Sequence, residues 1–271
     1  MTKLLAYTYD HLSCIADYGT PDKHSHLALH LIFSPECSFS GTADGAAFEG
    51  RAVFIDSDVP HTVNFDGCIA TVCLFEPVSA LGRYVKEAFL KEKSFYLPDE
   101  QFLDKITAVS ARYANLFHAE NFCIPKSDDC LEFDAQILES IGWKSRSQPD
   151  SAIDRRITAV KAMLSELETI PHDVMKLLCD TANLSQSRLS HLFTEQAGIP
   201  LHRYLAFIKI QKAFAHVRNG NNLTQAALDA GFDSSSHLAA TFKRMFGISF
   251  SQFLKSGTSI RREYHLGGNS I

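Results

Sequence analysis

The feature that most constrains this chain is a short pattern that occurs twice near its C-terminus, with the two copies 49 residues apart. In each copy a leucine precedes a phenylalanine by four residues, and a glycine follows the phenylalanine five residues later. These positions are Leu189, Phe193 and Gly198 in the first copy and Leu238, Phe242 and Gly247 in the second. Because such self-similarity marks a duplicated structural unit, we expect the segment from Val174 to Leu254 to contain one unit twice.

Each copy is typical of two helices joined by a tight turn. The turn falls at Asn183 in the first copy and at Gly231 in the second, and these residue types adopt positive φ most readily. Ser185 and Ser234 follow at the place where a side-chain oxygen caps the next helix.

The second helix of each copy has one apolar stripe, made by the leucine and the phenylalanine, and we expect its other face to be exposed. That face carries hydroxyl, amide, imidazole and cationic groups, which suit the base edges and phosphates of a DNA groove. The residues expected to contact DNA are Gln186, Ser187, Arg188 and His191 in the first copy and Ser235, Ser236, His237, Lys243 and Arg244 in the second.

The same segment resembles the DNA-binding domain of the AraC/XylS family of transcriptional regulators. The resemblance rests on the stretches Leu223 to Ala227, Gly231 to Phe232 and His237 to Gly247. It implies two helix-turn-helix units joined by one long helix, here Leu201 to Arg218, which sets the reading helices about 34 Å apart, one turn of DNA. It also implies a bacterial, sequence-specific transcription factor that is not an enzyme. Its partners would be double-stranded promoter DNA, a small-molecule effector, a second copy of the chain and RNA polymerase.

Charge is distributed unevenly along the chain. Residues 1–149 contain 12 Lys or Arg and 21 Asp or Glu, whereas residues 150–271 contain 14 and 10. A basic half joined to an acidic half is typical of a nucleic-acid-binding domain attached to a domain of another function. Ordinary variation of surface charge is the alternative, and the repeated helix pair favours the first explanation.

The sequence shows no targeting or membrane-spanning signal. It lacks a basic start followed by an apolar stretch and a cleavage site, and no apolar run approaches the roughly 20 residues of a membrane span. The seven cysteines are odd in number and include no Cys-x-x-Cys pair. We therefore expect a cytoplasmic protein with buried or reduced thiols. A redox pair formed by Cys123 and Cys130 is the alternative.

The N-terminal part has the pattern of a small all-β domain. Residues 4–76 contain short apolar runs at Leu27 to Phe33, Arg51 to Ile55 and Ile69 to Phe75, and Ser38 to Gly45 is rich in turn residues. His24, His26 and His30 share parity on one extended segment, so we expect their side chains to point to the same face.

This stretch resembles the cupin-like barrel that AraC/XylS regulators often carry at the N-terminus. In metal-binding cupins the ligands are a His-x-His pair, a glutamate four residues on and a later histidine. Here these positions correspond to His24, His26, His30 in place of the glutamate, and His61. We expect the four histidines to line an effector pocket without a cofactor; a bound divalent metal is the alternative. A metal-dependent cupin enzyme with an accessory helical domain is the alternative function.

Together these patterns predict an α+β chain. Its parts would be a barrel at residues 1–80, a helical dimerisation or packing region at 81–143, a linker at 144–152, the DNA-binding domain at 153–256 and a tail at 257–271. The expected helices outside the repeat are Leu81 to Lys91, Asp99 to Phe117, Leu131 to Ile141 and Asp154 to Leu167. The apolar stripe of the helix at 99–117 would either pair two subunits or cover the barrel.

Overall fold

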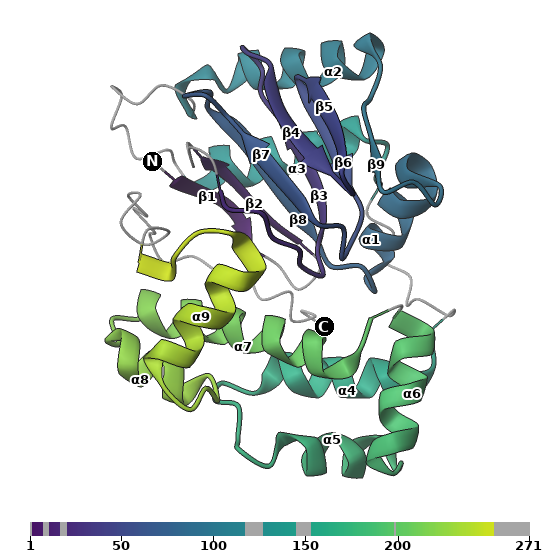
Figure 1. The fold of residues 1–271 in the computed structure, drawn as a ribbon, viewed down its shortest axis with the longest axis vertical. Coiled ribbons are helices and arrows are strands. Elements are labelled where there is room, and N and C mark those ends of the chain that lie inside the picture. The colour runs from purple at the N-terminus through teal and green to yellow at the C-terminus, as the bar shows by residue number, and fades with distance from the viewer. Residues whose placement is uncertain are drawn as a thin grey trace. The chain divides into compact units, whose positions relative to one another are not determined.

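The computed structural model describes residues 2–7, 11–16, 21–116, 127–144, 153–197 and 199–251 (Figure 1). The chain divides into two compact units, which we describe separately. The first is built from residues 1–146 with the segment from Phe246 onward, and the second from Ser147–Met245. The predicted tail, Cys123 and all of the predicted linker except Lys144 lie outside the described residues. None of the described helices is long and apolar enough to cross a membrane.

The first unit contains two antiparallel sheets. The six-stranded sheet has the order β1 (Thr2–Tyr7), β2 (His11–Ala16), β8 (Ala70–Phe75), β3 (Leu29–Phe33), β6 (Ala52–Ile55) and β9 (Phe95–Tyr96). The three-stranded sheet has the order β5 (Ala46–Gly50), β4 (Phe39–Ala43) and β7 (His61–Asn64). Among the described strands no pairing joins one sheet to the other, so the expected barrel is present as two separate sheets.

Three predicted strands are confirmed and one turn prediction is wrong. Strands β3, β6 and β8 fall within the three apolar runs. The stretch from Ser38 to Gly45, which we expected to be a turn, contains β4 and then a tight turn at Asp44 and Gly45. It is extended because β4 hydrogen-bonds to a strand on each side, β5 and β7, and these partners override its weak local preference.

The six-stranded sheet is buried on both faces, as the alternation along β3 shows. Leu29, Leu31 and Phe33 pack in one apolar cluster with the helices that follow the sheet. Ile32 belongs to a second cluster, which it shares with residues of the three-stranded sheet such as Phe39. Successive side chains of a strand point to opposite faces, so this sheet lies between the helices and the smaller sheet.

The helices of the first unit follow the sheets in the chain. They are α1 (Ala80–Val85), the π-helix η1 (Lys86–Leu90), α2 (Glu100–Arg112), the 3-10 helix η2 (Ala114–Leu116) and α3 (Ser127–Ser140). The side chain of Asp99 caps α2 by accepting a hydrogen bond from the Phe102 N–H at 2.9 Å. The apolar stripe of α2, including Ile106 and Val109, is buried in the cluster shared with the sheet. The stripe therefore covers the sheet, which was one of the two expected uses.

A buried polar contact holds α3 to the sheet. Nε2 of His11, on β2, lies 2.8 Å from a carboxylate oxygen of Asp134, on α3. The Ser13 hydroxyl donates to the other oxygen of the same carboxylate. All three side chains are buried, and each oxygen of Asp134 has a partner, as a buried carboxylate requires.

Cys37 and Cys68 form a disulfide, and their Cα atoms lie 6.2 Å apart. The expectation of thiols is therefore wrong for this pair, whereas Cys14, Cys73, Cys130 and Cys179 are free. Cys37 precedes β4 and Cys68 precedes β8, so the packing of the strands brings together residues that are 31 positions apart. Spacing in the sequence cannot show such a pairing.

The second unit consists of helices. They are α4 (Arg155–Glu166), α5 (Val174–Ala182), α6 (Gln186–Ala197), α7 (Leu201–Arg218), α8 (Leu223–Asp229) and α9 (Ser235–Phe246). The bounds of α7 are those expected for the long joining helix. Leu189, Phe193, Leu238 and Phe242 are buried, which confirms that the repeated pattern marks the inward stripes of α6 and α9.

Candidate DNA-binding interface, histidine cluster and helical pocket

The first helix-turn-helix is formed by α5 and α6. Asn183 ends α5 in the left-handed conformation, with φ of 50°. The Ser185 side-chain oxygen then accepts a hydrogen bond from the Arg188 N–H at 3.4 Å, and its carbonyl accepts from the Leu189 N–H at 2.9 Å. These contacts start α6 as the sequence predicted, so the turn and the cap set the direction of the helix.

The second helix-turn-helix, α8 and α9, repeats this geometry. Gly231 has φ of 81°, and the Ser234 side-chain oxygen accepts a hydrogen bond from the His237 N–H at 3.1 Å. The capping serine and its donor are each 49 positions after their counterparts in the first unit. A Cβ on Gly231 would lie 2.9 Å from the Ile170 carbonyl oxygen, so the turn also has no room for a side chain.

The residues expected to contact DNA lie on exposed parts of α6 and α9. All nine are exposed except Ser235, which is half-buried. Arg188 and His237 occupy equivalent positions but differ in their surroundings. His237 Nδ1 lies 3.0 Å from a carboxylate oxygen of Asp233, and its ring meets that of Phe232 edge-on at 5.3 Å. Within the described part of the chain, no acidic group pairs with the Arg188 guanidinium.

Helix α7 makes polar contacts with the second helix-turn-helix unit and with α4 that the sequence did not indicate. The Lys209 ammonium donates to the Gly231 carbonyl at 2.7 Å, in the turn before α9. The Lys212 ammonium donates to the Ser165 carbonyl, near the end of α4, at 2.8 Å. Burial lowers the pKa of both lysines. Such lysines resemble surface residues in the sequence, because only the fold brings main-chain oxygens to them.

In the first unit, the four histidines come together, although for a reason other than the expected one. His24 and His61 pair through their backbones, with the His24 N–H 3.1 Å from the His61 oxygen and the His61 N–H 2.8 Å from the His24 oxygen. The chain bends at residues 27–28, and only His30 lies within β3. The prediction that His24, His26 and His30 lie on one extended segment is therefore wrong. The cluster forms because this pairing brings residue 61 beside residue 24.

The imidazole rings of the histidine cluster (His24, His26, His30 and His61) are close to one another. Ring centroids lie 4.3 Å apart for His24 and His61, 4.4 Å for His26 and His30, and 4.6 Å for His30 and His61. Ring nitrogens of His24, His26 and His61 all lie within 4.8 Å of one another. Burial lowers the pKa of His61 to about 4 and also lowers the pKa of His24 and His30, so these imidazoles are neutral near pH 7.

The donor set of the cluster fits a first-row transition metal. Neutral imidazole is a preferred ligand of zinc, copper, nickel and iron. His30 is 4 % exposed, and its Nδ1 has no hydrogen-bond partner among the described residues. No described carboxylate or thiol belongs to the group of closely spaced donor atoms. The residues therefore suit these metals better than magnesium or calcium, which prefer oxygen ligands.

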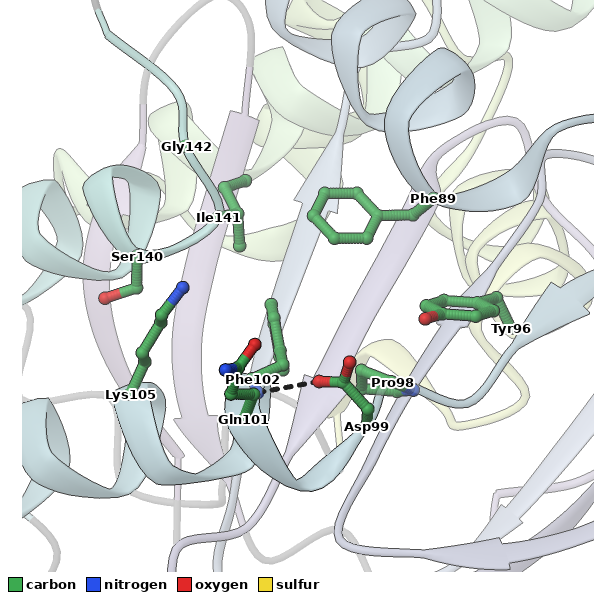
Figure 2. Close-up of a pocket in the computed structure, with 10 residues that line it drawn as sticks. All are labelled: Phe89, Tyr96, Pro98, Asp99, Gln101, Phe102, Lys105, Ser140, Ile141 and Gly142. Carbon is green, nitrogen blue, oxygen red and sulfur yellow. Dashed lines mark hydrogen bonds between the residues drawn. The ribbon is translucent and has the colours of Figure 1, made fainter.

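A second feature of the first unit is a pocket of about 280 Å³, and none of the four histidines lines it (Figure 2). Phe89, Tyr96 and Phe102 give it aromatic surface, and Lys105 extends from α2 towards the end of α3. The lining residues are Phe89, Tyr96, Pro98, Asp99, Gln101, Phe102, Lys105, Ser140, Ile141 and Gly142. No sequence signal marked this pocket, because its walls come from η1, β9, α2 and α3.

Comparison with known proteins identifies the C-terminal part. Residues 178–256 match the family model described as a helix-turn-helix domain. The chain is 32% identical over 77 residues to the HTH-type transcriptional regulator MtrA of Neisseria gonorrhoeae, which covers 28% of this chain and 26% of MtrA. It is 28% identical over 105 residues to an uncharacterized HTH-type transcriptional regulator of Haemophilus influenzae, covering 38% of this chain and 35% of that protein. The matches thus span roughly a third or less of these relatives.

The whole chain is similar in fold to ToxT of Vibrio cholerae. The crystal structure of ToxT from strain O395 covers 93% of this chain and 99% of its own, with a TM-score of 0.54 and 13% identity. ToxT with bound unsaturated fatty acid, from strain SCE256, covers 94% and 98%, with a TM-score of 0.52 and 14% identity. The chain therefore has the fold of ToxT, and residues 178–256 in its C-terminal part form a helix-turn-helix domain.

Proposed function

We propose that this protein is a sequence-specific DNA-binding transcriptional regulator that responds to a small molecule. The observation that carries the proposal is the duplicated helix-turn-helix. Helices α6 and α9 are capped in the same way, expose polar and cationic side chains, and are linked through α7. One unit with two exposed recognition helices is suited to two successive major grooves.

The two recognition helices have different roles in this proposal. Arg188 on α6 presents a guanidinium that can bind a guanine edge through two hydrogen bonds. Lys243 and Arg244, basic residues in the last turn of α9, would contact phosphates. His237 is already paired with the Asp233 carboxylate, whose negative charge opposes phosphate contact. The first unit is therefore expected to supply more of the specificity.

The proposal is tested by fluorescence anisotropy with the full chain and the DNA upstream of its own coding sequence. A titration at two salt concentrations, beside a scrambled duplex of equal length, separates specific from electrostatic binding. We expect tighter binding to the upstream fragment and a loss of affinity with salt on both duplexes. If neither duplex is bound even at low salt, the proposal is wrong.

For the effector, we propose a small organic acid in the pocket lined by Phe89, Tyr96 and Phe102. These rings supply apolar contact, and the Lys105 ammonium can neutralise a carboxylate. The ToxT structures support this class, because they include complexes with an unsaturated fatty acid and with (E)-4-(8-methylnaphthalen-1-yl)but-3-enoic acid. Lys105→Met should weaken binding of such acids in calorimetry, whereas Lys176→Met, in the second unit, should not.

Two further partners are part of the proposal, a second copy of the chain and RNA polymerase. Pairing through the apolar stripe of α2 is disfavoured because that stripe is buried within the first unit. Helix α3 leaves Leu131 48% exposed, which offers a starting point for a dimer contact. Sedimentation velocity of wild type and Leu131→Glu would show whether the chain self-associates there.

A metal-dependent enzyme is the second candidate function. The histidine cluster favours it, because three histidines with close ring nitrogens can hold a catalytic metal. Metal-assisted catalysis also needs an open ligand position and a nearby acid or base. No described carboxylate belongs to the group of donor atoms, so the regulator is the better supported function.

A further inference from the structure

We infer that the histidine cluster binds one first-row transition-metal ion through imidazole groups alone. His24, His26 and His61 supply three ligands, and His30 supplies the fourth. The inference concerns residues other than those that line the aromatic pocket and those proposed to contact DNA, so it stands whether or not the proposed regulator function is correct.

The backbone places the ligands before any metal is bound. His24 and His61 are fixed against each other by two main-chain hydrogen bonds. The carbonyl of His26 accepts a third, from the Asp58 N–H at 2.8 Å. His30 lies within β3, which pairs with β6 and with β8. The four side chains therefore start from paired backbone, which reduces the conformational entropy lost on binding.

Hydrogen bonds orient two of the rings in the way that metal ligands require. Nδ1 of His24 lies 2.8 Å from the Asp22 carbonyl, and Nδ1 of His61 lies 2.8 Å from the Val59 carbonyl. A carbonyl oxygen only accepts, so each Nδ1 carries the proton and each Nε2 keeps its lone pair. Histidines that bind metals commonly donate their other ring N–H to a backbone carbonyl in this way.

Only a small movement of the histidine side chains is needed to bring their ring nitrogens to the spacing of a metal site. Zinc binds imidazole nitrogen at about 2.0–2.1 Å, so tetrahedral ligand atoms lie about 3.4 Å apart. The nitrogens of His24, His26 and His61 lie within 4.8 Å of one another, which side-chain rotation of about an ångström can close. His30, whose ring lies 4.4 Å from that of His26 and 4.6 Å from that of His61, is near enough to join them.

His30 gives the site its selectivity. It stands at the position where the resemblance to metal-binding cupins places a glutamate, and it removes the one anionic ligand from the set. Imidazole ligands favour zinc, copper and nickel, whereas carboxylates suit manganese and magnesium. We therefore expect the wild-type chain to prefer zinc or cobalt(II) strongly over manganese.

The test uses the full chain, freed of metal with a chelator and then titrated with zinc, cobalt(II) and manganese. We expect one zinc per chain by calorimetry, and intense visible absorption from four-coordinate cobalt(II) that zinc displaces. His61→Ala should weaken zinc binding by more than about 100-fold, since even loss of an outer partner of a ligand costs 10- to 100-fold. His172→Ala removes an exposed histidine of the second unit and should change nothing.

Two measurements remain informative if the alanine variant folds poorly. In the wild-type chain, zinc should protect the half-buried His24 from acylation by diethylpyrocarbonate, with the modified residues identified by mass spectrometry. His30→Glu should raise the affinity for manganese relative to zinc by about tenfold or more, as a carboxylate ligand predicts. Equal acylation of His24 with and without zinc would overturn the metal site. An unchanged manganese-to-zinc ratio in His30→Glu would overturn the role of His30.

Discussion

Arg188 and His237 occupy the same position in two copies of one motif, yet they are held differently. The Arg188 guanidinium has no acidic partner among the described residues, whereas His237 lies against both Asp233 and Phe232. A side chain with free donors can hydrogen-bond to a DNA base at little free-energy cost. A side chain that is already paired must first break the hydrogen bond to its partner. At the scale of the residue, the two copies of the motif therefore differ in structure, and we expect them to differ in function.

Arg188→Ala should weaken binding to the operator by about 1–3 kcal/mol and relax selection at one base pair. The reason is the loss of a bidentate contact to guanine, which no neighbouring side chain of α6 can replace. Competition anisotropy with operators changed at single positions measures both effects. Arg155→Ala, an exposed arginine at the start of α4, serves as the matched control. Equal losses on operator and random DNA would show that Arg188 contacts phosphates and does not read a base.

Gly231→Ala should destabilise the second unit more than Gly220→Ala. Both glycines have positive φ, 81° and 96°, so both changes introduce backbone strain of about 1 kcal/mol. Only at Gly231 would the new Cβ meet another segment, at 2.9 Å from the Ile170 carbonyl, whereas nothing lies within 4 Å of a Cβ at Gly220. Urea denaturation followed by circular dichroism compares the two. Equal losses of stability would exclude a role for the Ile170 contact.

The residues that could be predicted from the sequence are those whose role is local. Asn183 and Gly231 have the expected positive φ, and Ser185 and Ser234 make the expected caps, because turns and caps involve neighbours in the chain. The histidines could be named as a set. Their convergence was predicted but its structural cause was not, because the pairing of His24 with His61 is a contact between distant segments.

At the scale of the element, α7 connects the two helix-turn-helix units through polar and aromatic contacts. Lys209 holds the turn before α9, Lys212 holds the end of α4, and Tyr204 packs its ring 5.0 Å from that of Phe193 on α6. These contacts fix both recognition helices to one rigid helix. The spacing of the two helices thus depends on side chains of α7 as well as on its length.

Lys209→Met should lower the free energy of unfolding of the second unit by about 1–3 kcal/mol. Methionine keeps much of the volume but leaves the Gly231 carbonyl without its charged donor. Lys176→Met, an exposed lysine on α5, should change stability by less than about 0.5 kcal/mol. We also expect Lys209→Met to weaken binding to a full operator more than to a single half-site. If the free energy of unfolding is unchanged in Lys209→Met, the hydrogen bond to Gly231 contributes nothing to the stability of the second unit.

The disulfide between Cys37 and Cys68 links segments of the first unit that precede two different strands. It closes a loop of 31 residues that includes the β4–β5 hairpin and β7. A loop of this length implies a stabilisation of about 3–4 kcal/mol by restriction of the unfolded chain. The double change Cys37→Ser and Cys68→Ser should lower stability by this amount in oxidising buffer. Cys179→Ser is the control, and dithiothreitol should affect wild type but not the double variant.

A helix or strand could be predicted from the sequence where its own residues carry a recognisable pattern. Helix α4 was predicted because its apolar stripe repeats within a few residues, whereas α7 was predicted from the resemblance to AraC/XylS regulators. Strand β4 was read as a turn because its partners β5 and β7, and not its own residues, make it extended. The pocket of Figure 2 and the disulfide had no sequence signal for the same reason, since each joins segments far apart in the chain.

For the whole molecule, the division of charge agrees with the division of structure. The acidic N-terminal half contains the sheets, the histidine cluster and the aromatic pocket, and the basic C-terminal half contains the two helix-turn-helix units. Because Trp143 is the sole tryptophan and packs against the core of the first unit, its fluorescence reports that unit alone. Unfolding of the first unit can therefore be followed by this signal.

The metal-free chain should lose stability in its first unit as the pH falls from about 6.5 to about 4. Burial lowers the pKa of His61 from 6.5 to about 4 and also lowers the pKa of His24 and His30, so the unfolded chain binds more protons in this range. Above pH 6.5 both states are neutral at these residues and no stability is lost. At about 1.4 kcal/mol per pH unit, His61 alone accounts for about 3 kcal/mol.

This dependence is measured by urea denaturation of the chelator-treated chain at several pH values, followed by Trp143 fluorescence. His61→Asn keeps a polar side chain but removes the titrating group, so its stability should fall less steeply between pH 6.5 and 4 than that of wild type. The carboxylates of the first unit titrate in both proteins, and their contribution cancels in the difference. If the two slopes are equal, His61 does not have the lowered pKa that its burial predicts, and the first unit admits water to the histidine cluster.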